Sequence, residues 1–256
     1  MIGCIIQARM GSSRLPGKTL IKLDEHRSAL DFVVNQLSFS TLLDKIVIAT
    51  TNLEQDDIIK KNAKTLGIDC FRGSSDDVLD RYYHCAKEFQ INTIVRITSD
   101  CPLIDPQIVD HVIKKYQDED YDYVTNTLIR SYPIGTDVEI FSFETLEKTW
   151  QKAILPSERE HVTLFIRNKK SGFKLGNLKN SKNLSRLRWT LDREEDLNLI
   201  RRIVVKVNKN PILMNDILNL FSVEPELIKI NEHIPQNEGL LKSLKKDDEF
   251  QNLKTD

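Results

Sequence analysis

The chain has 256 residues, which is long enough for one large domain with a substantial hydrophobic core. Hydrophobic residues make up 40% of it and charged residues 29%, as in an ordinary globular protein. The 37 Lys and Arg residues nearly balance the 38 Asp and Glu residues, for a formal net charge of -1. This balance argues against a nucleic-acid-binding protein and against a basic membrane-binding surface.

The cysteines and the apolar segments indicate the compartment. Cys4, Cys70, Cys85 and Cys101 form no C-x-x-C pair and fit no zinc-binding spacing. No apolar run approaches membrane-spanning length, and the N-terminus lacks a charged segment followed by a signal-length apolar stretch. We therefore expect reduced thiols in a cytoplasmic protein.

Strands and helices are predicted to alternate through the first half of the chain. Apolar runs predict strands at residues 2–8, 45–51, 70–71, 93–98 and 121–125. Between them, helical spacing predicts helices at residues 29–39, 54–66, 76–89 and 106–117. Continuous apolar strands separated by helices of this length indicate parallel βαβ units. An α/β fold with a mostly parallel central sheet follows.

The second half of the chain has a more mixed pattern. It predicts strands at residues 137–141 and 187–191, and helices at residues 143–153, 159–169 and 193–207. From about Asn231 the sequence is polar and loses its periodicity. We expect residues 1–230 to form a single domain and residues 231–256 to be a polar, loosely attached C-terminal tail.

The loop after the first predicted strand carries the strongest functional signal. Residues 8–18 read A-R-M-G-S-S-R-L-P-G-K. Its glycines let the backbone come close to a ligand, its N–H groups can point inward, and its cations neutralise negative charge, as an anion with several phosphates requires. A surface turn with incidental charge is the plainer alternative.

A Walker A motif does not account for this loop. That motif needs four residues between its glycines, whereas five separate Gly11 from Gly17. Pro16 stands where the second glycine should be, and proline has no N–H to donate to a phosphate. A P-loop NTPase is therefore disfavoured.

The loop resembles the signature A-R-x-G-S-x-R-L-P-x-K of the sugar cytidylyltransferases, which include CMP-Kdo synthetase and CMP-sialate synthetase, and above all the spore-coat-polysaccharide type. The resemblance implies a three-layer α/β/α, Rossmann-like nucleotidyltransferase fold of the nucleotide-diphospho-sugar transferase type. It implies transfer of CMP from CTP to a sugar or sugar-acid acceptor with release of pyrophosphate, for surface polysaccharide or glycan biosynthesis. It assigns Arg14 and Lys18 to catalysis. The nucleotide-binding residues in the loop would be Ala8, Arg9, Gly11, Ser12, Ser13, Arg14 and Lys18.

Two aspartates are candidate metal ligands. Asp100 directly follows the strand at residues 93–98, where a carboxylate can hold Mg²⁺, although a capped turn would also place an aspartate there. The family has a G-D-x-P or S-D-x-P element at this point, so the resemblance assigns Asp100 to metal binding and catalysis. Asp192 resembles the first position of the family's D-x-P-E-D pattern, with Glu194 in place of proline. A helix N-cap is the alternative for Asp192.

Further blocks resemble the family in the same order along the chain. Residues 71–83 nearly match its R-G-S-x-D-D-V-L-D-R-Y block, which implies that Arg72 and Ser74 help to frame the nucleotide base, while Asp76 could merely cap the next helix. Residues 135–141 and 159–163 resemble its G-x-D-V-E-x-F and R-E-H-V-T elements, which implies an acceptor side lined by Asp137, Glu139 and His161. The D-Y-D sequence at residues 120–122 is interpreted as a helix-to-strand loop.

Several alternatives stay open at this point. The chain could use another nucleotide or a sugar-phosphate acceptor, or it could be a non-catalytic nucleotide-binding protein of a glycan pathway. The sequence does not identify the acceptor. By resemblance we expect CTP and a small sugar-type acceptor as partners, Mg²⁺ as the cofactor and a possible homodimer.

Overall fold

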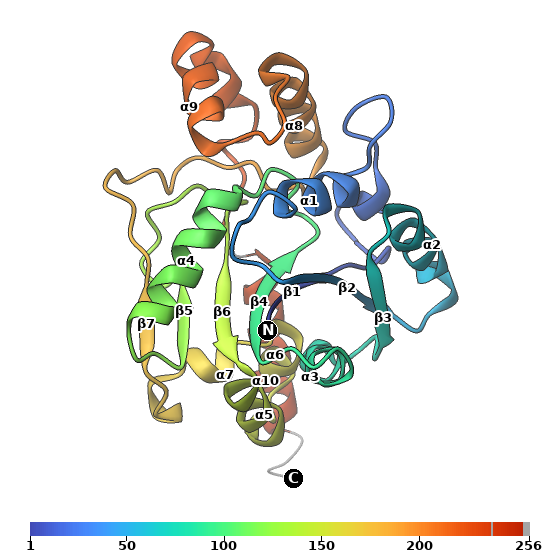
Figure 1. Ribbon diagram of the computed structural model, residues 1–256, viewed down its shortest axis with the longest axis vertical. Coiled ribbons are helices and arrows are strands. Elements are labelled where there is room, and N and C mark those ends of the chain that lie inside the picture. Colours follow the sequence, from blue (N-terminus) through green and yellow to red (C-terminus); the bar gives the residue numbers. More distant parts are fainter. Residues whose placement is uncertain (237, 253–256) are drawn as a thin grey trace.

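The central element is a seven-stranded sheet with the order β3-β2-β1-β4-β6-β5-β7, shown in Figure 1. The computed structural model describes residues 1–236 and 238–252. Its strands are β1 Ile2–Gln7, β2 Lys45–Thr51, β3 Asp69–Gly73, β4 Thr93–Thr98, β5 Tyr123–Thr125, β6 Glu139–Ser142 and β7 Leu175–Asn177. Strands β1 to β4 pair in parallel, as do β5 and β7, whereas β6 is antiparallel to both of its neighbours. The predicted mostly parallel sheet is confirmed.

Helices cover both faces of this sheet. Apolar residues of α1 Ala29–Leu37, α2 Asp57–Leu66 and α4 Pro106–Asp118 pack on one face, together with Cys4 and Ile6 of β1. Apolar residues of α3 Val78–Glu88 and α5 Phe143–Lys152 pack on the other face, together with Ile5. Successive residues of β1 thus point to opposite layers, as the pleat of a strand requires. The three-layer α/β/α fold is confirmed.

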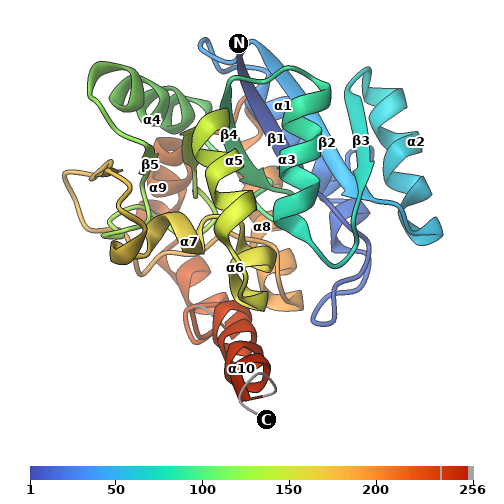
Figure 2. The ribbon, with the colours of Figure 1, turned by 90° about the horizontal axis from the view of Figure 1, so that it is seen from below.

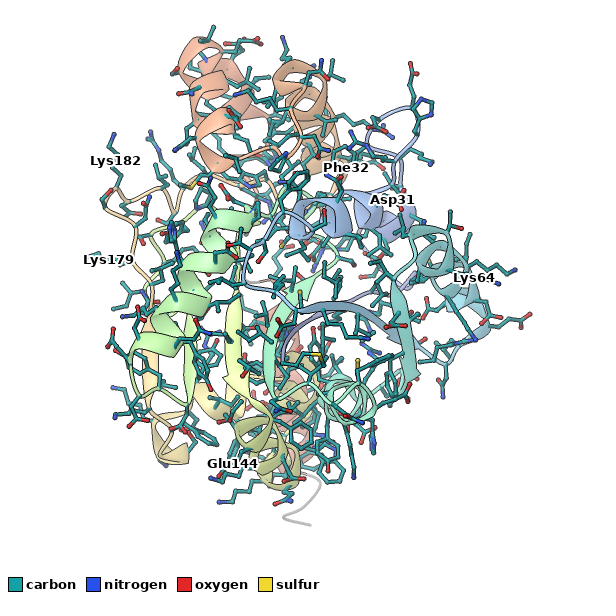
Figure 3. The ribbon with its side chains drawn as sticks, viewed as in Figure 1. Asp31, Phe32, Lys64, Glu144, Lys179 and Lys182 are labelled. Atoms are coloured by element: carbon teal, nitrogen blue, oxygen red, sulfur yellow. The ribbon has the colours of Figure 1, made fainter. Side chains whose placement is uncertain are left out.

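A third apolar cluster lies outside these layers. Helices α8 Glu194–Val207 and α9 Met214–Val223 pack over α1, at the top of Figure 1. Phe32 of α1 lies on the side of that helix that faces α8, whereas charged side chains such as Lys64 and Lys179 lie at the periphery (Figure 3). Buried Trp189 belongs to the same cluster. This cluster fixes the segment that leads into α8.

Side-chain caps and glycine stops set the ends of several helices. Ser28 caps α1, and Asp105 caps α4 directly before Pro106. Helix α2 ends at Gly67, which has a φ of 69°, as its sequence predicts. The cap of α3 is Asp77, whose carboxylate accepts the N–H of Asp80, and not Asp76.

Three segments of the second half differ from their predictions. The helix predicted at residues 159–169 is divided into α6 Pro156–His161 and α7 Leu164–Arg167, because Val162 between them has a φ of 60°. Residues 187–191 form no strand beyond a single bridge to Ile134, because their alternating apolar side chains pack on helices instead of a sheet. The sequence predicts no strand at β7, because this strand has no apolar run of its own. Its Gly176 is covered by Tyr121 and Val124 from the neighbouring segment.

The C-terminal segment also differs from its expectation. A loosely attached tail is predicted from about Asn231, but the structure has helix α10 Glu238–Asn252 packed against α6 (Figure 2). Asp247 accepts hydrogen bonds from the backbone N–H and the hydroxyl of Ser157, at 2.8 and 2.5 Å. Because α10 docks through polar side chains while Leu241 and Leu244 stay exposed, no apolar stripe marks it in the sequence. A single domain over residues 1–230 stays a prediction.

None of the helices formed by the described residues has the length and apolar character that crossing a membrane requires.

Gly135 provides a test of how the segment before β6 packs against the segment that leads into α8. Its φ is 102°, and a Cβ there would lie 2.7 Å from the backbone nitrogen of Thr190. Gly135→Ala should therefore lower the free energy of unfolding by about 2 kcal/mol or more. The matched control is Gly172→Ala, also at positive φ but with nothing within 4 Å of the new Cβ, which should cost only about 1 kcal/mol. Urea unfolding measures both, and equal losses would contradict this packing.

Candidate active site

The parallel pairing of β1 with β4 brings the loop at residues 8–18 and Asp100 together. Gln7 at the end of β1 pairs with Thr98 at the end of β4. The loop at residues 8–18 and the segment at residues 99–101 therefore leave the same edge of the sheet, where ligands bind in folds of this type. Buried Asp56 holds the loop, because its Oδ1 accepts the N–H of Met10 at 2.7 Å.

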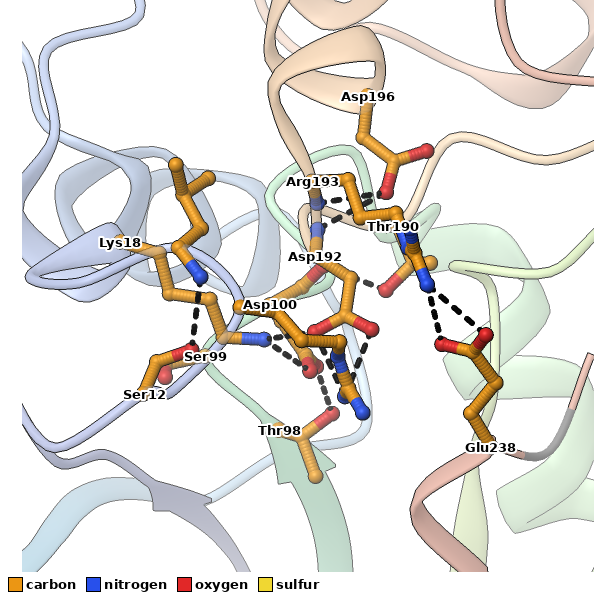
Figure 4. Close-up of polar contacts among 12 residues, drawn as sticks. Ser12, Lys18, Thr98, Ser99, Asp100, Thr190, Asp192, Arg193, Asp196 and Glu238 are labelled. Carbon is orange, nitrogen blue, oxygen red and sulfur yellow. Dashed lines mark hydrogen bonds and ion pairs between the residues drawn. The ribbon is translucent and has the colours of Figure 1, made fainter. Parts of the chain in front are cut away.

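Lys18 stands at the centre of this edge, between two carboxylates (Figure 4). Its Nζ donates to Asp100 Oδ2 at 3.0 Å and to Asp192 Oδ1 at 2.8 Å. Arg14 Nη2 also contacts Asp192, at 2.9 Å from Oδ1 and 2.7 Å from Oδ2. Thr98 donates to Asp100 Oδ1 at 2.5 Å. The structure thus brings together the two predicted metal ligands and the two predicted catalytic cations.

These contacts shift the pKa values of the central groups. Burial opposes the charged form of Asp100, but the Lys18 ammonium and the Thr98 hydroxyl outweigh it and lower the pKa of Asp100 to about 2. Burial likewise opposes ionisation of Asp192, yet Lys18 and Arg14 lower its pKa. Burial also disfavours the Lys18 ammonium, but Asp100 and Asp192 raise the pKa of Lys18. All three groups are charged at neutral pH.

Asp192 is positioned by a buried ion pair on the neighbouring turn. Asp196 accepts Nε and Nη2 of Arg188, both at 2.8 Å, and also the N–H groups of Asp192 and Arg193, both at 3.0 Å. Arg193, not Asp192, is the N-cap residue of α8. The N-cap alternative for Asp192 is therefore wrong, and its carboxylate is directed to Lys18 and Arg14 instead.

A cavity of about 430 Å³ opens beside the loop. Its lining includes most of the predicted nucleotide-binding residues of the loop: Arg9, Gly11, Ser12, Ser13, Arg14 and Lys18. Thr98, Ser99 and Asp100 close one side of the cavity, and Lys246 of α10 reaches it from another. Polar groups and cations thus dominate its wall.

The remaining predicted nucleotide residues do not line this cavity. Ala8 is buried, with its N–H bonded to the carbonyl oxygen of Ala49. Arg72 donates to the carbonyl oxygens of Thr51 and Leu53, at 3.0 and 2.8 Å. The Ser74 hydroxyl accepts the N–H of Asp77, so it supports the start of α3. A role for Ala8, Arg72 and Ser74 in binding the nucleotide stays a prediction.

A second cavity of about 590 Å³ adjoins the first, and both are lined by Thr98 and Asp100. The predicted acceptor residues Asp137, Glu139 and His161 all line it. The structure thus places Asp100 where the two cavities meet. A molecule bound in either cavity would come close to Asp100.

The two acidic residues of the larger cavity are paired with arginines. Arg130 binds Asp137 through two hydrogen bonds of 2.6 and 2.7 Å. Glu139 is paired with Arg96 and accepts the hydroxyls of Tyr123 and Thr163, at 2.5 and 2.6 Å. Burial opposes the ionised form of Glu139, but Arg96 and these hydroxyls lower its pKa. The carboxylates of Asp137 and Glu139 are thus held in fixed positions.

His161 contacts the C-terminal helix. Its Nε2 lies 2.9 Å from Ser243 Oγ, and that hydroxyl donates to Glu160 at 2.8 Å. Burial, together with nearby Arg96, lowers the pKa of His161. The imidazole is therefore neutral near pH 7 and can donate or accept a hydrogen bond.

Sequence reasoning missed several residues of these cavities. Arg130 and Arg167 line the larger one, and Gln236 of the C-terminal segment joins them. Arg130 lies in a loop that matches no motif. Only the structure shows that it pairs with Asp137. The C-terminal segment is polar and lacks periodicity, so nothing in its sequence indicates that Gln236 lies beside the larger cavity.

The two aspartates fit a magnesium ion. Their oxygens converge on one cation, the Lys18 ammonium, and carboxylate oxygens are the ligands that Mg²⁺ prefers. Throughout residues 1–236 and 238–252, no group of three or more His, Cys, Asp or Glu side chains could hold a metal ion. A magnesium ion at Asp100 and Asp192 would thus need water or phosphate oxygens as its other ligands.

Comparison with known proteins identifies relatives over most of the chain. The family model described as cytidylyltransferase matches residues 3–218. The chain is 34% identical to an uncharacterized protein, MJ1063, of Methanocaldococcus jannaschii over 91% of this chain and 95% of that protein. It is 33% identical to the spore coat polysaccharide biosynthesis protein SpsF of Bacillus subtilis, over 87% of this chain and 94% of the relative.

A solved structure agrees with these matches. A cytidylyltransferase from Leptospira borgpetersenii serovar Hardjo-bovis superposes with a TM-score of 0.85 and 34% sequence identity, covering 89% of this chain and 96% of the other. The family model spans the loop, Asp100 and Asp192. The chain therefore belongs to the cytidylyltransferase family and is a nucleotidyltransferase.

Proposed function

We propose that this protein transfers CMP from CTP to a sugar or sugar-acid acceptor and releases pyrophosphate. The observation that carries the proposal is the placement of Asp100, between a cavity lined by the cations of the loop and a cavity lined by the acceptor-side residues. The spore coat relative suggests that the product serves surface polysaccharide biosynthesis. A cytoplasmic location and a homodimer stay predictions.

In this mechanism the smaller cavity binds the triphosphate. Arg9, Arg14 and Lys18 line it and neutralise the charge of the phosphates and of the departing pyrophosphate. Gly11 and Ser13 line the same wall and would turn their N–H groups to a phosphate, whereas the N–H of Ser12 donates to the carbonyl oxygen of Met10 at 2.9 Å. A hydroxyl oxygen of the acceptor attacks the α-phosphorus from the larger cavity, in line with the leaving group, so positioning supplies much of the rate.

Asp100 and Asp192 would hold Mg²⁺, which neutralises phosphate charge and polarises the phosphoryl oxygens when it is bound. The chain itself supplies the rest of the arrangement. Asp196 orients Asp192, and Thr98 orients Asp100. The acceptor is oriented by His161 and by the arginine–carboxylate pairs Arg96–Glu139 and Arg130–Asp137.

Use of a different nucleotide is a second candidate. The loop lines the cavity with backbone groups and cations, which recognise phosphates but not a base. The two residues expected to frame the base, Arg72 and Ser74, bond to neighbouring backbone groups. Base preference must therefore be measured.

A thermal-shift panel measures that preference. CTP, GTP, UTP, ATP and dTTP are each added with and without Mg²⁺, and the melting temperature of the wild-type protein is recorded. We expect a Mg²⁺-dependent stabilisation by CTP that exceeds the others, because a ligand that binds only the folded state raises its stability. A larger shift with another nucleotide would replace CTP as the substrate. No shift with any of them would favour a non-catalytic protein.

Substitution of Lys18 tests the catalytic site. Lys18→Ala should keep the fold but lower kcat/KM by roughly two to three powers of ten, because a cation about 4 Å from developing charge is worth about 4 kcal/mol at an effective dielectric of ~20. Pyrophosphate release with an acceptor found by screening measures it.

The matched control is Lys115→Ala, since Lys115 of α4 pairs with Glu119 just after that helix, at 2.7 Å, and lines neither cavity. The control should keep wild-type kcat/KM. A Lys18→Ala enzyme with near wild-type kcat/KM would remove Lys18 from the mechanism.

A further inference from the structure

We propose that the Lys18 ammonium is an internal counter-ion that keeps free divalent cations off Asp100 and Asp192, so that the metal enters only together with the nucleotide. The proposal rests on the proposed nucleotidyltransferase function. It adds a role for Lys18 in the protein without nucleotide, where its ammonium bonds to the carboxylate oxygens that a resident metal ion would use.

The first argument is that Lys18 uses the same oxygens that a metal ion would use. Its Nζ lies 3.0 Å from Asp100 Oδ2 and 2.8 Å from Asp192 Oδ1, so one cation already joins the two carboxylates. The other oxygen of each carboxylate also has a donor: Thr98 on Asp100, at 2.5 Å, and Arg14 on Asp192, at 2.7 Å. A free metal ion that joins the two carboxylates therefore competes with these donors for the same oxygens.

The second argument is the charge balance. Two carboxylates face two cations, Lys18 and Arg14, and Arg9 lines the same cavity. A free divalent cation would therefore approach carboxylates whose charge is already neutralised, while meeting repulsion from the neighbouring cations. The Lys18 and Asp192 side chains are only 13% and 15% exposed, so water screens the repulsion weakly there, and more strongly at Asp100, which is 30% exposed.

The third argument is that the protein supplies too few ligands on its own. Within the described part of the chain, the carboxylates at this edge form no group of three or more potential metal-binding side chains. Mg²⁺ demands near-octahedral coordination and gives up its bound water reluctantly. Two carboxylates without further ligands therefore bind it weakly. Phosphate oxygens in the adjoining cavity would complete the set.

A triphosphate reverses all three conditions. Its negative charges attract Lys18, Arg14 and Arg9, and the flexible four-carbon stem of Lys18 lets its ammonium turn from the carboxylates to the phosphates. The carboxylate oxygens are then released to a metal ion that the same phosphates help to bind. Metal and nucleotide therefore favour each other's binding, by the same factor in both directions.

The test measures binding of free Mn²⁺ to the folded protein without nucleotide, by the loss of the electron paramagnetic resonance signal of the unbound ion. We expect Lys18→Met and Lys18→Gln to bind Mn²⁺ at least about tenfold more tightly than the wild type, because each removes the positive charge at the carboxylates. Lys115→Met is the matched control: it also deletes a lysine paired with a carboxylate, and it should match the wild type.

Adding Asp100→Asn to each Lys18 variant locates the gained site. The double variants should lose the gained affinity. The proposal is overturned if the wild type binds Mn²⁺ as tightly as both Lys18 variants do. It is also overturned if the gain in affinity survives Asp100→Asn. Tight binding of free Mn²⁺ by the wild type that Asp100→Asn abolishes also overturns it, and this arm needs no Lys18 variant to fold. Failure of the proposed function is seen separately, as the lack of any nucleotide shift in the wild-type protein.

Discussion

The parallel pairing of β1 with β4 is the constraint on which the site depends. In a parallel pair both strands end at the same edge, so whatever follows each strand must meet there. The chain follows β1 with a loop of glycines and cations, and β4 with Asp100. An antiparallel pair would separate Lys18 from Asp100 by the length of a strand. The sheet therefore determines that cation and carboxylate face each other, and the loop needs only to curve toward its neighbour.

Aspartates in this region differ in role because their partners differ. Asp196 is fully buried and bonds to Arg188, to two backbone N–H groups and to Asn231, so its oxygens are used within the protein. Asp100 and Asp192 instead bond to Lys18 and Arg14, whose flexible side chains line a cavity. Structural contacts to backbone cannot be exchanged for a ligand, whereas contacts to mobile cations can. This difference separates the positioning carboxylate from the two that can change partners.

The sequence predicts this fold and site where the signal is local. A buried strand followed by glycine and cations, or by Ser99-Asp100, places the loop and the first aspartate at the sheet edge. The signal fails where burial comes from tertiary partners. Residues 187–191 alternate like a strand but pack on α8 and α9, and α10 docks through Ser243 and Asp247 without an apolar stripe. Arg130 joins the larger cavity by a pairing with Asp137 that no spacing reveals.

Ion pairs hold most of the charged side chains around the two cavities, with Arg9 and Arg167 as further cations in their walls. Arg96 with Glu139, and Arg130 with Asp137, neutralise each other in the larger cavity, as Lys18 and Arg14 do with Asp100 and Asp192 at the smaller one. An isolated ion gains little from a neutral pair, because it attracts one member and repels the other. A ligand that carries both anionic and cationic groups can bind each member of a pair at once. A triphosphate accompanied by a metal ion is such a ligand, and an isolated cation is not.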